Sequence, residues 1–202
     1  MPEPILAPRS ALASVLTPGH YGAESGAGVT LRECRGLSLF SIAARAGKAA
    51  ELSATIERAF GVPLPTHPAR IANGTVAFIW SGPDSWLAVC SRENDFASRL
   101  ETLSGSLAAI TDLTGSQVLV RISGPRARDG LMKVVPVDLD DAVFRTGSAA
   151  LTIASHVRVH LWRIDDTPTY EIACPRSYAV SLWHGLTVAF EEYGYRVTEL
   201  AG

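Results

Sequence analysis

Cysteine is scarce in this sequence, and its few cysteines are not spaced for a metal or redox site. Cys34, Cys90 and Cys174 lie far apart, and no Cys-x-x-Cys pair occurs, which argues against a zinc knuckle and a thioredoxin-type pair. Each lies within or beside an apolar run, where a reduced cysteine behaves as a small hydrophobic residue. This pattern indicates a reducing compartment, and we expect the chain to be cytoplasmic.

Long apolar runs and concentrated positive charge are lacking too. Runs such as 76–80 are too short to cross a bilayer, and the N-terminus lacks the basic and apolar regions of a secretory signal. The net charge is −2, and lysines and arginines are scattered, whereas a nucleic-acid binder concentrates them in a basic patch. We therefore expect no contact with membrane or nucleic acid.

The composition, 47% hydrophobic and 19% charged, supplies enough apolar material for a folded core. Residues 1–29 differ from the rest because proline and glycine interrupt them. We expect an extended N-terminal arm there, whose apolar residues include Ile5, Leu6 and Leu12. Such an arm cannot build its own core, so it packs either on its own domain or on a partner protein.

Residues 30–202 alternate between strand and helix patterns, which predicts an α+β fold. Helical spacing covers residues 46–60, 93–103, 125–133 and 177–194, with Ser177 as the expected N-cap of the last helix. Strand patterns fill most of the remaining segments. We expect a single domain over 30–202 of two layered, ferredoxin-like parts with mainly antiparallel sheets, and 30–114 and 115–202 as the candidate halves.

Glycine-rich loops and nucleophile motifs do not form a cofactor or catalytic site in this sequence. Gly22, Gly26 and Gly28 do not match the dinucleotide-binding pattern, and no strand precedes them. Neither a Walker sequence nor a Gly-x-Ser-x-Gly elbow occurs. We therefore interpret the glycine segment as a flexible connection and expect no cofactor-binding residue and no catalytic nucleophile.

His156 and His160 are four residues apart, a spacing that would place both on one metal in a helix. The segment alternates apolar and polar residues instead, and in a strand residues four apart are separated by about 13 Å. We predict no metal site. The face that carries His160 and Trp162 is expected to meet solvent or a partner subunit, since interfaces favour tryptophan and arginine.

Charged residues in two settings remain as candidates. Asp138, Asp140 and Asp141 form an acidic run, which we interpret as a solvated loop rather than a cation site because the glycine and glutamate of an EF-hand are missing. Arg126, Arg128 and Arg176 stand at predicted helix starts. They fit either a carboxylate or phosphate site or helix capping with internal salt bridges, and we favour the second.

A series of short motifs, spread in order over nearly the whole chain, resembles the gamma subunit family of heterotetrameric sarcosine oxidase. The motifs are Arg9-Ser10, Trp80-x-Gly82-Pro83-Asp84-x-Trp86, Asp112-Leu113-Thr114, Arg121-Ile122-Ser123-Gly124-Pro125, Pro136-x-Asp138-Leu139, Phe144-x-x-Gly147, Trp162-Arg163 and Pro175-Arg176-Ser177-Tyr178. One departure is Ala11, where the family pattern has proline. More distantly, the family is similar to part of the glycine-cleavage T-protein fold.

This resemblance implies a subunit that works beside alpha, beta and delta subunits. Together they would demethylate sarcosine oxidatively to glycine, with hydrogen peroxide and either formaldehyde or methylene-tetrahydrofolate as products. FAD, FMN, NAD, tetrahydrofolate and zinc are implied for the other subunits. For this chain we predict a non-catalytic role, with Ile5, Leu6, Leu12, His160 and Trp162 as candidate partner contacts.

Two alternatives stay open. The first is a free-standing folate-binding or aminomethyl-transfer protein of T-protein type, for which Asp112 or Asp138 would be the candidate acid. The second is a gamma-like subunit of a related demethylase that acts on dimethylglycine.

Overall fold

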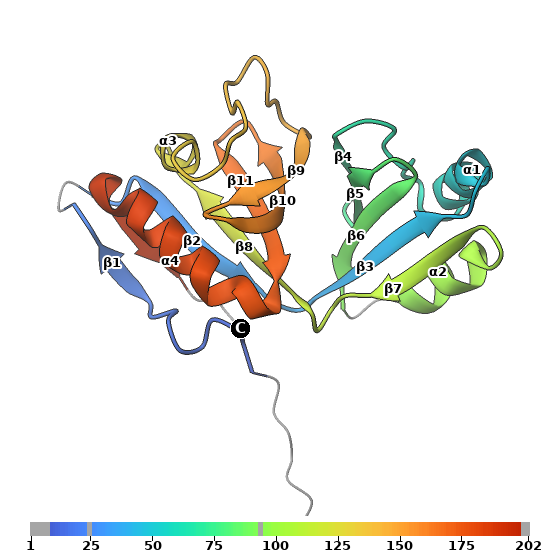
Figure 1. Ribbon diagram of the computed structural model, residues 1–202, viewed down its shortest axis with the longest axis horizontal. Helices are drawn as coiled ribbons and strands as arrows, with labels where there is room; N and C mark the ends of the chain where they lie inside the picture. The colour runs from blue at the N-terminus through green and yellow to red at the C-terminus, as the bar shows by residue number, and fades with distance from the viewer. Residues whose placement is uncertain (1–8, 24–25, 93–94, 199–202) are drawn as a thin grey trace, which may run out of the picture.

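The computed structural model describes residues 9–23, 26–92 and 95–198, which form two β-sheets with helices on their outer sides. Figure 1 shows the sheets inclined to each other like an open V, with α3 and α4 on one flank and α1 and α2 on the other. None of the described helices has the length and apolar content that crossing a bilayer requires.

The larger sheet has the strand order β1 (Gly19–Tyr21), β12 (Tyr195–Val197), β2 (Val29–Cys34), β8 (Gln117–Ser123), β11 (Thr169–Pro175), β10 (Val157–Asp165) and β9 (Ala149–Ala154). The smaller sheet has the order β4 (Arg70–Ala72), β5 (Val76–Gly82), β6 (Ser85–Ser91), β3 (Leu37–Ala44) and β7 (Ala108–Asp112). Every described pairing is antiparallel except that of β12 with β2.

The helices are α1 (Ala49–Phe60), α2 (Phe96–Ser104), α3 (Ala127–Leu131) and α4 (Ala179–Phe190), and the short turns η1 (Arg176–Tyr178) and η2 (Glu191–Tyr193) flank α4. The smaller sheet is ferredoxin-like, because β3-α1-β5-β6-α2-β7 is a βαββαβ run whose strands lie in the order β5-β6-β3-β7. The larger sheet repeats this with β8, β10, β11 and β12, and β2 is inserted between β12 and β8. The predicted α+β class with mainly antiparallel sheets is confirmed.

Three apolar clusters hold these layers together, and strand alternation decides which side chains belong to each. On β10, Val157, Val159 and Leu161 face the core under α3 and α4. On β3, Phe40 and Ile42 face the core under α1 and α2. The opposite faces of the two sheets form a third cluster, listed here in chain order: Leu39, Ala77, Ile79, Leu87, Val89, Leu119, Ala149, Trp162 and Ala173.

Backbone hydrogen bonds also join the two sheets at one corner. The amide of Arg70 donates to the carbonyl of Gly147 at 2.7 Å, and the amide of Ala149 donates to the carbonyl of Pro68 at 3.2 Å. Because these bonds link the start of β4 to the start of β9, they fix one sheet against the other. The two ferredoxin-like layers therefore pack directly against each other.

The candidate halves 30–114 and 115–202 remain a prediction, and the sheets add one detail to it. Strand β2 lies before the proposed boundary but pairs with β8 and β12 in the larger sheet. The described part of the arm packs on its own chain, since Leu12 is fully buried in the core under α4. Strand β1 also belongs to the arm and pairs with β12, so a strand does precede Gly22, contrary to our expectation.

The expected N-cap at Ser177 is wrong. Residues 176–178 form the single turn η1, and Tyr178 precedes α4 without a side-chain cap.

The glycine segment after β1 is also more tightly held than the flexible connection we expected. A Cβ atom on Gly28 would lie 2.8 Å from the Tyr193 carbonyl oxygen, so glycine is needed there for close backbone approach.

Candidate functional site

A buried acid lies between the two sheets at the centre of the first polar site. Glu171 of β11 is 5% exposed, and its Oε1 accepts bonds from Nε and Nη2 of Arg121 at 2.9 and 2.5 Å. Its Oε2 accepts a bond from the indole nitrogen of Trp162 at 2.8 Å. Both carboxylate oxygens are therefore occupied by partners within the chain, as a stable buried charge requires.

The cavity beside this acid has a volume of about 460 Å³ and is lined in part by Arg70, Arg121, Trp162 and Glu171. Cys34 approaches Glu171 with its sulfur, but burial, and then the charge of Glu171, raises the pKa of that thiol to about 11. Burial raises the pKa of Cys174 to about 12. Thiols with raised pKa values stay protonated at neutral pH and are poor nucleophiles.

The sequence did not single out Glu171 or Arg121 as a pair, because they are fifty residues apart in the chain. One signal was present: Glu171 interrupts the otherwise apolar strand Tyr170 to Cys174. A lone charge in a strand of that kind indicates a buried ion pair.

The candidate partner contacts have different positions in the structure. Trp162 is 0% exposed and packs between the sheets, and Leu12 is 0% exposed in the core under α4. Neither side chain offers a surface to a partner in this conformation: the second sheet covers the β10 face that carries Trp162, and Leu12 lies in the core under α4. Ile5 and Leu6 lie outside the described residues.

His160 is half-buried on the same face of β10, and its Nε2 lies 2.7 Å from the hydroxyl of Ser81 on β5. This contact links the two sheets. His156 lies in the turn between β9 and β10 with a positive φ of 70°. Within residues 9–23, 26–92 and 95–198, no three His, Cys, Asp or Glu side chains gather as metal ligands.

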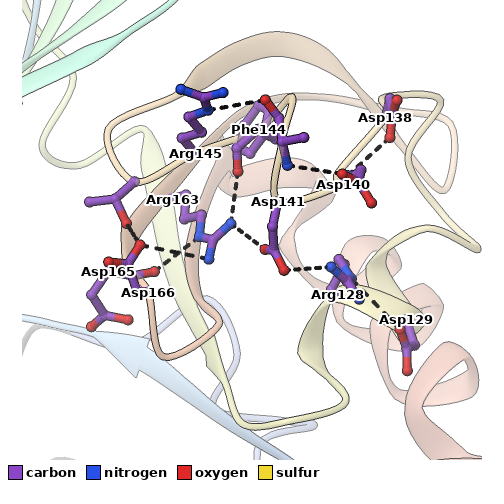
Figure 2. Close-up of polar contacts among 12 residues, drawn as sticks. Arg128, Asp129, Asp138, Asp140, Asp141, Phe144, Arg145, Arg163, Asp165 and Asp166 are labelled. Carbon is purple, nitrogen blue, oxygen red and sulfur yellow. Dashed lines mark hydrogen bonds and ion pairs between the residues drawn. The ribbon is translucent and has the colours of Figure 1, made fainter.

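The acidic run folds into a loop that a buried arginine holds in place (Figure 2). Arg163 is 3% exposed, and its Nη1 donates to Asp141 at 2.6 Å and to the Phe144 carbonyl at 2.9 Å. Arg128 donates to the other oxygen of Asp141 at 2.8 Å. Asp138 and Asp140 accept only backbone amides in the described bonds. This network is an anchor for the loop, and its pairing matches the interpretation of Arg128 as an internal salt bridge.

The two acids named for an aminomethyl-transfer mechanism lie on separate parts of the fold. Asp112 ends β7 of the smaller sheet, and Asp138 lies in the loop before β9. Hydrogen bonds from Thr114 lower the pKa of Asp112. A general acid needs a pKa near the working pH, so this change makes Asp112 a poorer candidate.

A groove lined by arginines is a further polar feature, and it has a volume of about 400 Å³. Four arginines line it, namely Arg9, Arg35, Arg92 and Arg176. Of the three arginines at predicted helix starts, Arg176 alone belongs to this groove. Arg126 instead pairs with Asp129 at 2.9 Å and lies over the ring of Tyr193.

The layered fold defines the class of protein. A glycine-cleavage aminomethyltransferase T from Bartonella henselae superposes with a TM-score of 0.58 at 16% identity, over 86% of this chain and 48% of that one. The chain therefore has an α+β fold of the T-protein type. A chain of heterotetrameric sarcosine oxidase from Corynebacterium sp. U-96 superposes with a TM-score of 0.81 at 26% identity, over 92% and 96% of the two chains.

Sequence comparison identifies the family. Residues 45–192 match the sarcosine oxidase, gamma subunit family. The sarcosine oxidase subunit gamma of Corynebacterium sp. strain U-96 is 31% identical over 82% of this chain and 80% of its own length. That of Arthrobacter sp. is 30% identical over 74% and 73%. The chain belongs to the sarcosine oxidase gamma subunit family.

Proposed function

We propose that the chain is a non-catalytic, structural subunit of a heterotetrameric sarcosine oxidase. The assembly would demethylate sarcosine oxidatively to glycine, with hydrogen peroxide and either formaldehyde or methylene-tetrahydrofolate as products. The observation that carries this proposal is the superposition on a chain of a solved heterotetramer over 92% of this chain and 96% of that one.

The partners in this proposal are alpha, beta and delta subunits in the cytoplasm. FAD, FMN, NAD, tetrahydrofolate and zinc would lie on those subunits. Two polar sites of the described residues support this division of roles, because their acids are paired internally: Glu171 with Arg121 and Trp162, and Asp141 with Arg163 and Arg128. Acids committed to internal pairs contribute to stability and are poorly placed to act on a substrate.

Co-purification tests the proposal. The chain is tagged in its native bacterium, and the proteins recovered with it are identified by mass spectrometry and by flavin absorbance, with an untagged strain as the control. We expect a yellow complex with two larger subunits and one smaller one, and activity on sarcosine. Greater activity on dimethylglycine would redirect the proposal to the related demethylase.

The contrary result is a chain that purifies alone, without colour, and binds tetrahydrofolate. That outcome would overturn the subunit proposal in favour of a free-standing folate-binding or aminomethyl-transfer protein. The family match over residues 45–192 supports the subunit proposal over this alternative.

A further inference from the structure

The arginine groove, defined by Arg9, Arg35, Arg92 and Arg176, lies where the chain passes between the two sheets. Its floor contains the connectors from β2 to β3 and from β7 to β8. The second connector is tied to β3, since the Leu113 amide donates to the Leu39 carbonyl at 2.8 Å and the Leu39 amide donates to Thr114 Oγ1 at 3.1 Å. A groove with a hydrogen-bonded backbone floor keeps its shape before any ligand binds.

The groove carries excess positive charge. Glu33 is the one carboxylate among the described residues that line it, and it is 7% exposed. Ser10 Oγ donates to Glu33, and Arg35 Nε pairs with its Oε2 at 2.7 Å. With four arginines and one glutamate, the described lining of the groove has a net charge of +3.

No carboxylate of the described residues forms an ion pair with the remaining three arginines. Arg176 donates from Nη2 to the carbonyl of Arg9 at 2.5 Å, which holds these two residues together. Asp112 lies just outside the lining; hydrogen bonds from Thr114, and more weakly the charge of Arg92, lower its pKa. Within the part of the chain that the structure describes, Asp112 is therefore the acid near Arg92, and the arginines of the groove still outnumber its acids.

Three of the motifs on which the family resemblance rests meet here, although they are far apart in the sequence. Arg9-Ser10 comes from the arm, Thr114 follows β7, and Arg176 follows β11. The internal pairs of the fold do not account for the exposed guanidinium groups of these motifs. Their convergence on one surface groove indicates a binding role.

The exposure of the groove indicates the kind of ligand. Pockets for small molecules bury most of the ligand surface, but Arg9, Arg92 and Arg176 are exposed, and the Arg35 side chain is 51% exposed. A small anion would stay in contact with water and would be screened by salt. A protein surface supplies carboxylates and also covers the groove, and arginine is enriched in such interfaces.

We propose that the arginine groove docks an acidic segment of a partner subunit, whose aspartate or glutamate side chains pair with Arg92 and Arg176. This inference rests on the proposed function, because it needs a partner polypeptide. The neighbouring surface extends the same contact, since a hollow lined by Ala11, Pro175 and Ser177 shares Arg176 with the groove, and Tyr178 beyond it is 55% exposed.

Zero-length crosslinking tests the docking directly. The sequence contains two lysines, Lys48 and Lys133, so introduced lysines stand out. Arg92→Lys and Arg176→Lys keep the charge and supply an amine that carbodiimide joins to a carboxylate in contact with it. In the co-purified complex, we expect crosslinks from these positions to aspartate or glutamate of another subunit.

Arg58→Lys, at an exposed position on α1, is the matched control and is expected to give no crosslink to that segment.

Charge reversal supplies the affinity measurement. For Arg92→Glu combined with Arg176→Glu, we expect recovery of the partner subunits to fall by about tenfold or more, because like charges then oppose each other. Arg58→Glu should leave recovery at the wild-type level.

The outcomes separate this inference from the proposed function. If the wild-type chain recovers partner subunits, but the charge reversal recovers them equally well and the lysine variants give no crosslink, the groove proposal is wrong and the subunit role stands. If the wild-type chain recovers no subunits, both proposals fail. Circular dichroism and thermal melting of the reversed variant show whether a loss of recovery comes from the groove or from unfolding.

Discussion

At the scale of single residues, His160 shows how burial between the sheets makes stability depend on pH. Burial, and then the charge of Arg158, lowers its pKa from 6.5 to about 4. Between these values the unfolded chain binds a proton that the folded chain does not, so stability decreases as the pH falls from 6.5 towards 4. Well above pH 6.5 both states are neutral at this position and the effect is absent.

We predict that His160→Gln reduces this acid sensitivity. Glutamine can keep a hydrogen bond to Ser81 but does not titrate. Between pH 7 and pH 4.5, the wild-type chain should lose about 1–3 kcal/mol more of its free energy of unfolding than the variant does. Urea denaturation at both pH values measures this difference, with His184→Gln at an exposed position of α4 as the control. Equal losses in wild type and variant would contradict the assignment.

Residue patterns predicted local structure better than they predicted contacts. Alternation on β10 correctly separated Val157, Val159 and Leu161 from the face with His160 and Trp162. It could not show that a second sheet covers this face, because that contact involves residues about eighty positions away. For the same reason, the Arg121–Glu171 pair was not predicted.

At the scale of elements, the packing of α3 on α4 depends on a residue without a side chain. A Cβ atom on Gly130 would lie 2.1 Å from the ring of Phe190, which is fully buried in the core. We predict that Gly130→Ala lowers the free energy of unfolding by about 1–3 kcal/mol through overpacking. Thermal or urea denaturation measures the change.

Gly74→Ala is the control for this prediction. A Cβ atom there meets nothing within 4 Å, and the backbone is not left-handed. We expect its effect to stay within about 0.5 kcal/mol. If the two variants were equally stable, α3 and α4 would not pack as closely as the structure shows.

The buried Arg163 anchors the acidic loop, together with Arg128 on the same carboxylate of Asp141, so Arg163→Lys should loosen the loop locally. Lysine cannot reproduce the bonds of the guanidinium group to Asp141, Phe144 and Asp165. We predict a loss of about 2–3 kcal/mol in stability and faster proteolysis within residues 138–145. Limited proteolysis with mass spectrometry locates the cuts.

Arg145→Lys provides the comparison, because Arg145 is exposed and donates only to the carbonyl of Ala142 in the described bonds. Its digestion pattern should match that of the wild-type chain. A pattern equally unchanged in Arg163→Lys would show that the loop does not depend on the buried arginine.

The elements also show where sequence periodicity stops being informative. Helices α1, α3 and α4 fall within the predicted segments, and α2 and the long strands match theirs to within about three residues at their ends. Strands β1, β4 and β12 were not predicted, and each has only three residues. Three residues are too few to show alternation, and these strands exist because an edge or a neighbouring strand is available for pairing.

At the scale of the whole molecule, the two ferredoxin-like layers enclose an apolar interior and carry one surface groove with excess positive charge. The buried charges are paired within the chain, while the arginine groove has charge left over at the surface. This combination fits a subunit whose function is assembly, and it agrees with membership of the gamma subunit family. Sequence motifs predicted that family, whereas the groove became visible only when three distant motifs met in the fold.

Native mass spectrometry of the complex purified through the tagged chain tests the central claim most directly. Our account predicts an assembly of four different polypeptides that contains this 21.5 kDa chain once, and loss of the chain on mild activation without loss of the flavins. A spectrum that shows the chain only as a 21.5 kDa monomer, or in complexes with copies of itself, would contradict the claim.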